Sequence, residues 1–377
     1  MKNTARIVTL SALTCIAAQA APFLAVGDNA ELFVTASGVI KFDDNIYMDA
    51  ANEQDDTIFS FTPGVDLVFG KGAAASGNVY YKEEIRRYTD ADNQDTELSD
   101  VGARVNYSNG LTKGNFNAQY AQLAQNDNDI NPTGAGVIAR RKVTNLGGNL
   151  EFSVTEKVAL SVGSTFAKTD YAPVSYVDSD VWTTPLDLYY KATPKMDWSL
   201  GYQYRSSDLG GAGRDSDDSF FNLGVRGEFS PKLSGQVRFG YTQRSFDVGG
   251  DEDLFGVSGN VNYLYSDKSS YQFTVSNDFA SSAVGASTKN FSIGLTSKTR
   301  FSEQLSLDLG LTFRSADYIA ATPARGDDFL EARAGLKYVY SKMLNFDASI
   351  TVSNNDSTLA VAEFSNNVIS FGANVRY

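Results

Sequence analysis

Apolar and polar residues alternate one by one along much of this chain. Between Leu305 and Phe313 every second residue is Leu or Phe, and the residues between them are polar, charged or glycine. The same alternation occurs at residues 198–205, 236–242, 291–295 and 330–338. A period of two places the two sets on opposite faces of a β-strand. Most segments span about ten to fourteen residues, which suits the ~9–11 residues that cross a bilayer at a tilt. We therefore predict membrane-crossing strands.

The connections between these segments alternate between short and long. Short turns are expected at residues 155–156, 193–195, 230–232, 266–268 and 302–303. Long polar connections are expected at residues 43–56, 89–96, 125–140, 170–180, 206–218, 246–253, 280–288, 317–328 and 354–365. Short turns on the periplasmic side and long loops outside are characteristic of bacterial membrane barrels. The pattern predicts an all-β fold, a transmembrane antiparallel β-barrel of about eighteen strands, with sixteen as the alternative.

The first residues have the layout of a secretory signal peptide. Lys2 and Arg6 precede an apolar run, residues 7–18, which is followed by an Ala-Gln-Ala site. The run is too short to cross a membrane, and no later segment approaches the ~18–20 apolar residues of a spanning helix. We therefore expect export after cleavage of residues 1–20, and a single barrel domain over residues 21–377.

The composition argues against an enzyme. The chain has no histidine, which excludes His-based triads and the usual zinc sites. Its one cysteine, Cys15, lacks the leucine three positions earlier that a lipoprotein site usually has. A formal charge of −13 disfavours nucleic acid as a partner. The residues from Asp127 begin like a calcium loop, but Pro132 and Ile138 replace its glycine and glutamate. We expect no catalytic residue, metal or cofactor.

The C-terminal residues form a strand whose apolar face finishes at an aromatic residue. Ile369, Phe371, Ala373, Val375 and Tyr377 share one parity. This ending resembles the C-terminal β-signal of bacterial outer-membrane proteins, which the barrel-assembly machinery recognises. More broadly, the chain is similar to the β-barrel porin families of bacterial outer membranes. The resemblance implies an outer-membrane location, with lipid, lipopolysaccharide and the assembly machinery as partners.

Two further features concern the wall of the expected barrel. Aromatic residues near strand ends, such as Tyr189 and Tyr190, are typical of the belts at membrane interfaces. Pro63 interrupts the alternation of residues 57–69 and cannot donate a backbone hydrogen bond, so we expect a β-bulge there. A soluble sandwich is the alternative, but sandwiches have turn signals every ~8–12 residues instead of alternating short and long connections.

If the apolar parity faces lipid, the other parity faces the lumen. Its charged residues are mostly basic, so we expect a modestly basic wall, with the acidic excess in the long loops. Such a wall suits hydrophilic solutes, and bracing by buried Arg–carboxylate pairs is the alternative role. The pore-lining candidates are Arg104, Arg205, Arg226, Arg238, Arg244, Asp308, Arg314, Glu331, Arg333 and Lys337. The same parity also holds Lys82, Arg86, Lys298, Arg376, Asp66, Glu84, Glu151, Asp187, Glu228 and Asp278.

This architecture favours a passive pore. The segment before the first expected strand, at Glu31, leaves no room for the plug of an energised receptor. Our first hypothesis is an outer-membrane channel for passive diffusion of small hydrophilic solutes, with residues 125–140 as the candidate constriction. The alternatives are a conduit for a secreted exopolysaccharide and a structural or adhesive barrel with a closed lumen. A homo-oligomer is compatible with this class, but the alternation reveals no interface.

Overall fold

The computed structural model describes residues 21–126, 138–172, 175–210 and 215–377. In this part of the chain, regular structure is almost entirely antiparallel strand, and the long strands have 13 to 15 residues. The strands are β1 (Leu24–Val26), β2 (Ala30–Asp43), β3 (Asp56–Phe69), β4 (Ala75–Tyr88), β5 (Thr96–Ser108), β6 (Thr112–Ala124), β7 (Arg140–Ser153), β8 (Val158–Tyr171), β9 (Ser179–Thr193), β10 (Met196–Leu209), β11 (Ser216–Ser230), β12 (Leu233–Phe246), β13 (Glu252–Ser266), β14 (Ser269–Ser281), β15 (Ser287–Arg300), β16 (Leu305–Tyr318), β17 (Gly326–Val339), β18 (Leu344–Ser357) and β19 (Phe364–Arg376). Two 3-10 turns, η1 (Asp92–Gln94) and η2 (Ala360–Ala362), lie in loops.

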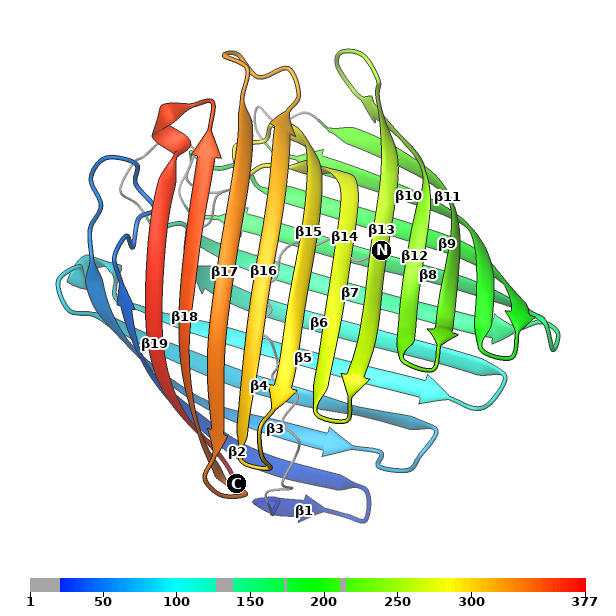
Figure 1. Ribbon diagram of the computed structural model, residues 1–377, viewed down its shortest axis with the longest axis horizontal. Coiled ribbons are helices and arrows are strands. Elements are labelled where there is room, and N and C mark those ends of the chain that lie inside the picture. Colours follow the sequence, from blue (N-terminus) through cyan, green and yellow to red (C-terminus); the bar gives the residue numbers. More distant parts are fainter. Residues whose placement is uncertain (1–20, 127–137, 173–174, 211–214) are drawn as a thin grey trace.

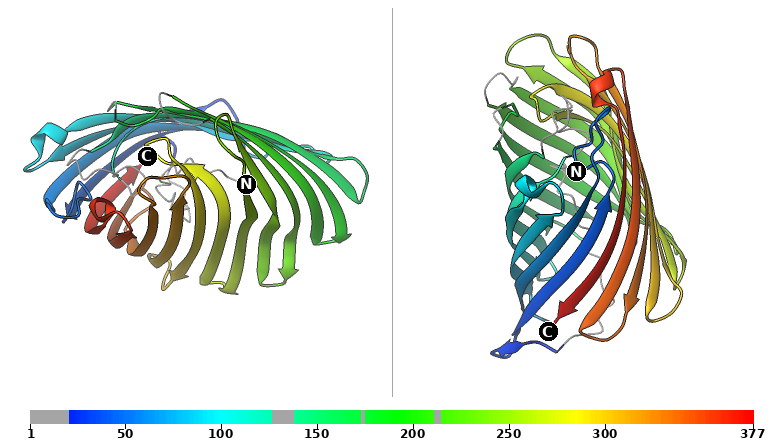
Figure 2. Two further views of the ribbon diagram at one scale, coloured as in Figure 1. Left: turned by 90° about the horizontal axis from the view of Figure 1, so that it is seen from above. Right: turned by 90° about the vertical axis from the view of Figure 1, so that its left-hand side faces the viewer.

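The sheet closes on itself between its first and last long strands. β19 pairs with β2, from Val368 opposite Asp43 to Arg376 opposite Thr35, and every other long strand pairs with its sequence neighbours. The described residues therefore form a barrel of eighteen strands, β2 to β19, which confirms the predicted count; sixteen is wrong. Closure is required because an unpaired N–H or C=O costs several kcal/mol in lipid. Figures 1 and 2 show that the ring is flattened.

The connections alternate as predicted. Short turns follow the odd-numbered strands from β3 to β17, and mostly longer connections follow the even-numbered strands (Figure 1). The connections predicted at residues 206–218 and 280–288 are shorter than expected because the flanking strands extend into them. The predicted signal peptide, residues 1–20, lies outside the described residues.

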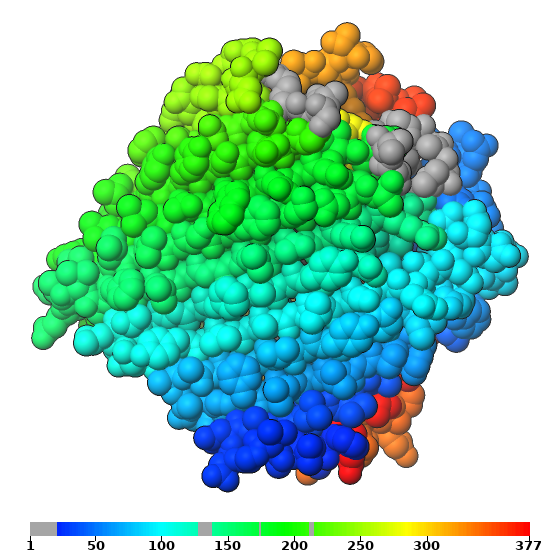
Figure 3. Space-filling view, turned by 180° about the vertical axis from the view of Figure 1, so that it is seen from behind, coloured from blue at the N-terminus to red at the C-terminus, as the bar shows by residue number. Residues whose placement is uncertain are grey.

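The predicted apolar parity forms the outer face. Leu309 and Leu311 are 45% and 48% exposed. Soluble proteins rarely expose so extensive an apolar surface, whereas lipid covers it in a membrane. Figure 3 shows a continuous outer face on the side of the molecule opposite to that of Figure 1. The described part of the chain contains no helix that is long and apolar enough to cross a bilayer.

The β-bulge expected at Pro63 is wrong. β3 is unbroken, and Pro63 lies opposite Ala36 of β2. On the other side, the ladder with β4 skips Thr62 and Pro63 but resumes at Gly64 opposite Lys82 in unchanged register. The missing proline N–H therefore interrupts pairing on one side of the strand without inserting an extra residue.

The seam of the barrel is fastened near the C-terminus. Val34 and Tyr377 exchange two backbone hydrogen bonds, with N···O distances of 2.7 and 2.9 Å. The ring centroids of Phe23 and Tyr377 are 6.0 Å apart. β1 covers the stretch of β2 that β19 leaves unpaired, with Leu24 opposite Leu32. Three residues are too few to show a period, which explains why the alternation does not predict β1.

We expect deletion of residues 375–377 to impair closure. The deletion removes both hydrogen bonds of Tyr377 and exposes part of the β2 edge, at a cost of several kcal/mol in an apolar medium. The measurement is the folded, heat-modifiable fraction after refolding into detergent micelles, where no assembly machinery takes part. Tyr377→Ala is the control, because it keeps the backbone pairing. An equal folded fraction for the deletion and the parent chain would contradict the role of the seam.

Candidate functional site

Contacts that reach past neighbouring strands identify the inner face of the barrel. Arg226 of β11 donates to Glu151 of β7 over 2.7 Å, and Arg238 of β12 donates to Asp187 of β9 over 2.9 Å. Side chains on strands that are not neighbours meet on the concave side of a curved wall. Because cross-strand partners share a face, the register extends this assignment around the barrel. The inner parity is the one that the sequence assigns to the lumen.

Arg226 is held by two carboxylates and an aromatic ring. Its two Nη atoms bind both oxygens of Glu151, at 2.7 and 3.0 Å, and its Nε donates to Asp197 over 3.0 Å. Its guanidinium carbon lies 3.3 Å from the centroid of the Tyr189 ring, a cation–π contact. Bidentate pairing fixes the plane of the guanidinium group. Arg226 therefore ties β11 to β7 across the interior.

Tyr189 faces the interior instead of the membrane. It is 5% exposed, and its hydroxyl accepts a hydrogen bond from Arg238 over 2.7 Å. The next residue, Tyr190, is 51% exposed on the outer face. Adjacent residues of a strand point to opposite faces. The expectation that both tyrosines belong to an interfacial belt is therefore wrong for Tyr189.

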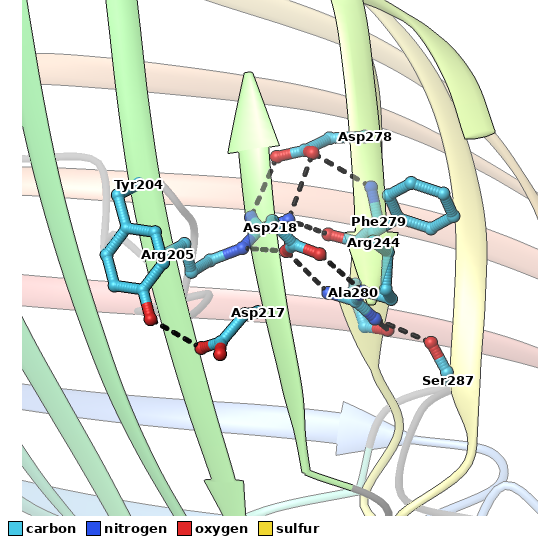
Figure 4. Close-up of polar contacts among 9 residues, drawn as sticks. All are labelled: Tyr204, Arg205, Asp217, Asp218, Arg244, Asp278, Phe279, Ala280 and Ser287. Carbon is cyan, nitrogen blue, oxygen red and sulfur yellow. Dashed lines mark hydrogen bonds and ion pairs between the residues drawn. The ribbon is translucent and has the colours of Figure 1, made fainter. Parts of the chain in front are cut away.

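A second ion cluster lies nearer the long loops and joins β10, β11, β12 and β14 (Figure 4). Asp218 accepts hydrogen bonds from Arg205 and from Arg244, whose Nη2 lies 2.8 Å from Oδ2 of Asp218. Arg205 also binds both oxygens of Asp278, at 2.9 and 3.1 Å. The side chains of Arg205, Asp218 and Arg244 are all buried. This cluster therefore fastens β14 to the wall formed by β10–β12.

The end of the β14–β15 hairpin folds away from the wall into the barrel. β14 pairs with β13 only as far as Asn277 opposite Val257, but it stays paired with β15 up to Ser281. Phe279 has outer-face parity, yet it is 2% exposed, and the Arg244 guanidinium carbon lies 4.8 Å from the centroid of its ring. The outer face of the hairpin end therefore packs on the inner face of β12. Figure 2 shows these yellow strand ends inside the ring.

The tip of this hairpin touches the opposite side of the barrel mouth. The N–H of Val177, between β8 and β9, donates to the carbonyl of Ala283 over 2.8 Å. Ala283 also belongs to a buried cluster with Ala139, against which Tyr171 and Tyr176 pack. The hairpin thus crosses the interior and narrows the passage. The sequence predicts only an ordinary outer loop here, because alternation does not show which way a hairpin bends.

The connection between β6 and β7, the predicted constriction, is described only at its ends. The Asn126 side chain donates to the carbonyl of Tyr47 over 3.1 Å and accepts from the N–H of Ala139 over 2.8 Å. Ile138, at 5% exposure, packs in a buried cluster with residues of neighbouring loops and strand ends. Residues 127–137 lie outside the described residues, so constriction by this connection stays a prediction.

The predicted pore-lining residues differ in their surroundings. Arg205, Arg226, Arg238 and Arg244 are held in ion pairs. In contrast, Arg104 and Arg333 are exposed, as is Lys298 of β15, and none of these three forms an ion pair with a described carboxylate. The structure therefore separates arginines that brace the wall from cations that face the solvent of the lumen. The other candidates are buried or partly buried: Asp308, Arg314, Glu331 and Lys337.

The inner wall is not basic, contrary to the expectation. The sequence assigns twelve basic and eight acidic residues to this face, and the register adds five basic and nine acidic residues to it. The described strands therefore carry seventeen cations and seventeen carboxylates on the inner face, and the added cations are Lys41, Lys113, Arg141, Lys191 and Arg300. The sequence pattern assigns Asp218 to a loop, but β11 begins at Ser216 and includes it. Asp218 has the same parity as Asn222, so a longer predicted strand would have placed it on the inner face. Five of the added carboxylates lie opposite a basic residue that the sequence assigns to this face: Asp100 opposite Lys82, Asp197 opposite Arg226, Asp218 opposite Arg205 and Arg244, Glu252 opposite Arg244, and Asp347 opposite Lys337. The other four are Glu31, Asp43, Asp56 and Asp327.

Comparison with solved structures places the fold among bacterial porins. OpdK of Pseudomonas aeruginosa, crystallised with vanillate, is 9% identical, with 93% of this chain and 99% of that chain covered and a TM-score of 0.50. OccAB2 of Acinetobacter baumannii is 12% identical, with 93% and 98% covered and a TM-score of 0.51. A BenF-like porin from Pseudomonas fluorescens Pf-5 is 12% identical, with 93% and 99% covered and a TM-score of 0.50. At these identities the similarity concerns the fold.

Sequence comparison identifies the family. No curated protein matches this chain. A family model described as "Putative beta-barrel porin 2" matches residues 21–377, the whole of the predicted barrel domain. The closed ring of eighteen strands and its charged interior agree with that description. The chain therefore belongs to the family "Putative beta-barrel porin 2", and its barrel is that of an outer-membrane porin.

Proposed function

We propose that this protein is a passive channel for small hydrophilic solutes in the bacterial outer membrane. The observation that carries the proposal is a closed eighteen-strand barrel with charged side chains on its inner face. A barrel of this strand number is wide enough for an aqueous channel, and a charged wall stays hydrated. Solutes would move down their own concentration gradient, and no reaction would take place in the lumen.

Within this proposal, the exposed cations contact the solute and the paired arginines support the wall. Arg104, Arg333 and Lys298 keep their charge available to a passing anion, because no described carboxylate pairs with them. Small organic carboxylates are the solute class that such cations favour. The crystal of OpdK with vanillate, itself a carboxylate, supports this class by analogy.

Export and assembly complete the proposal. The family match begins at residue 21, directly after the predicted cleavage site, which supports a signal peptide over residues 1–20. The residues of the proposed assembly signal lie on β19 and, for Tyr377, directly after it, on the outer-face parity, where the assembly machinery and later lipid and lipopolysaccharide would contact them. These residues are Ile369, Phe371, Ala373, Val375 and Tyr377.

Swelling of liposomes that contain the refolded protein tests the channel. We expect swelling in isotonic solutions of small sugars and organic acids, and a rate that falls as the solute becomes larger. Protein-free liposomes are the control. If liposomes with folded protein swell no faster than protein-free liposomes, the result would favour the alternative of a closed, structural barrel.

Charge reversal tests whether the exposed cations, and not the ion-paired arginines, set the ion selectivity of the pore. The triple variant Arg104→Glu, Lys298→Glu and Arg333→Glu should shift the reversal potential under a salt gradient toward cation selectivity, because it places three negative charges in the solvent-facing lumen. Arg104→Gln, Lys298→Gln and Arg333→Gln together should give a smaller shift in the same direction. An unchanged reversal potential in the glutamate variant would remove these residues from the selectivity of the pore.

Removal of a brace should destabilise the barrel. Arg226→Met leaves Glu151 and Asp197 without their shared cation, and loss of one partner of a buried ion pair costs about 3–5 kcal/mol. Because Arg226 is a quarter exposed, we expect the lower part of this range. Equilibrium unfolding in urea from lipid vesicles measures the effect. Arg104→Met is the matched control, with an expected change within about 0.5 kcal/mol; equal losses in both variants would contradict the bracing role.

A further inference from the structure

The inward fold of the β14–β15 hairpin leaves a stretch of strand edge vacant on β13. The ladder between β13 and β14 ends at Val257 opposite Asn277. β13 begins five residues earlier, at Glu252, and that stretch is paired with β12 but not with β14. A side chain partly substitutes for the missing ladder, since the Asn277 amide donates to the carbonyl of Phe255 over 2.8 Å. The barrel therefore has a local break in its wall near the long loops.

The vacant edge matches the hairpin in register. Continuing the existing ladder would place Gly256 opposite Asp278, Phe255 opposite Phe279 and Leu254 opposite Ala280. The parity also agrees, because Phe255 lies on the outer face, 64% exposed, and Phe279 has outer-face parity as well. β14 stays paired with β15 to its end, so the two strands can move as one hairpin. The end of β14 could therefore occupy a second position, paired with the vacant edge of β13. We call this position the wall seat, and the observed position the inward seat.

Ionic contacts hold the hairpin in its inward seat. Beyond the Arg205–Asp278 pair, the Arg205 guanidinium donates to the carbonyl of Phe279 and that of Arg244 to the carbonyl of Ala280, each over 3.0 Å (Figure 4). Lys289, the cross-strand partner of Phe279, donates over 2.7 Å to Glu252 on the vacant edge of β13. The two arginines therefore bind backbone carbonyls at the end of β14, and Lys289 ties β15 to the edge of β13.

Asp218 lowers the free-energy cost of moving the β14–β15 hairpin away from Arg205 and Arg244. Arg205 and Arg244 both bind Asp218 on the neighbouring strand β11, independently of the hairpin. If the hairpin moved out, the two arginines would share Asp218, so neither buried arginine would lack a carboxylate partner. In exchange, the hairpin would gain backbone hydrogen bonds along the vacant edge of β13. The inward position is thus stabilised by charge-assisted hydrogen bonds, and the wall position would be stabilised by backbone hydrogen bonds to β13.

We propose that the β14–β15 hairpin is a gate with two seats: folded inward across the lumen, or paired with residues 252–256 of β13 as part of the wall. In the wall position the hairpin leaves Val177 and clears the mouth of the barrel. The Arg205–Asp278 pair is the latch of the inward position. The gate deepens the proposed channel function and depends on it only for its effect on conductance.

Disulfide trapping tests the two seats without requiring conductance. The only cysteine in the sequence is Cys15, outside the barrel, so introduced pairs are free of competition. Val177→Cys with Ala283→Cys joins the contact of the inward seat, and Leu254→Cys with Ala280→Cys joins the predicted register of the wall seat. We expect both pairs to cross-link under mild oxidation, as seen by gel mobility before and after reduction. Cross-linking of the first pair alone would overturn the proposal.

Conductance then tests the gate. The oxidised Val177–Ala283 pair should hold single channels at the lower conductance level, the oxidised Leu254–Ala280 pair at the higher one, and reduction should restore transitions. Asp278→Asn should raise the ratio of time spent at the higher conductance level to time at the lower level about tenfold or more, because it removes the charge-assisted bond to Arg205. Asp66→Asn, which breaks an Arg–Asp pair distant from the hairpin, is the control. Equal conductance of the two oxidised pairs would also overturn the gate, whereas absence of any conductance in the parent protein would count against the channel instead.

Discussion

Backbone hydrogen bonding in an apolar solvent is the constraint on which this structure depends. Lipid offers no partner for a peptide N–H or C=O, so each membrane-crossing strand needs a paired neighbour on both sides. The pairing of β19 with β2 meets this requirement at the seam. Once the ring is closed, the period of two divides every strand between lipid and lumen. The exposed apolar outer face and the charged inner face are therefore two results of one requirement.

The same constraint explains how the charges of the interior are arranged. A charged group inside a barrel needs either a partner or water. Arg226, Arg238 and the Arg205–Arg244 cluster have carboxylate partners, some of them on strands that are not neighbours, and these pairs tie distant parts of the ring together. Arg104 and Arg333 remain exposed to the lumen. The hairpin can leave the wall at its long-loop end, where water can replace the lost backbone partners.

Local patterns predict the strands well but not the contacts across the lumen. Alternation and the succession of short and long connections were enough for the fold class, the strand count and the inner parity. The Arg226–Glu151 contact joins β11 to β7, and a period of two carries no information on such partners. The inward fold of residues 277–287 depends on that kind of contact, so its sequence looks like any other loop. At Pro63 a local rule predicts too much: the missing N–H leaves a gap in the ladder with β4, but the expected bulge does not form.

Single-channel conductance of the refolded barrel, residues 21–377, in a planar bilayer tests the central claim most directly. A continuous water-filled path through the ring predicts stepwise openings whose conductance grows in proportion to the salt concentration. The electrophoretic heat-modifiability of the same preparation establishes that the barrel is folded. A folded, heat-modifiable barrel that produces no openings at any voltage or salt concentration would contradict the account of this protein as a passive channel.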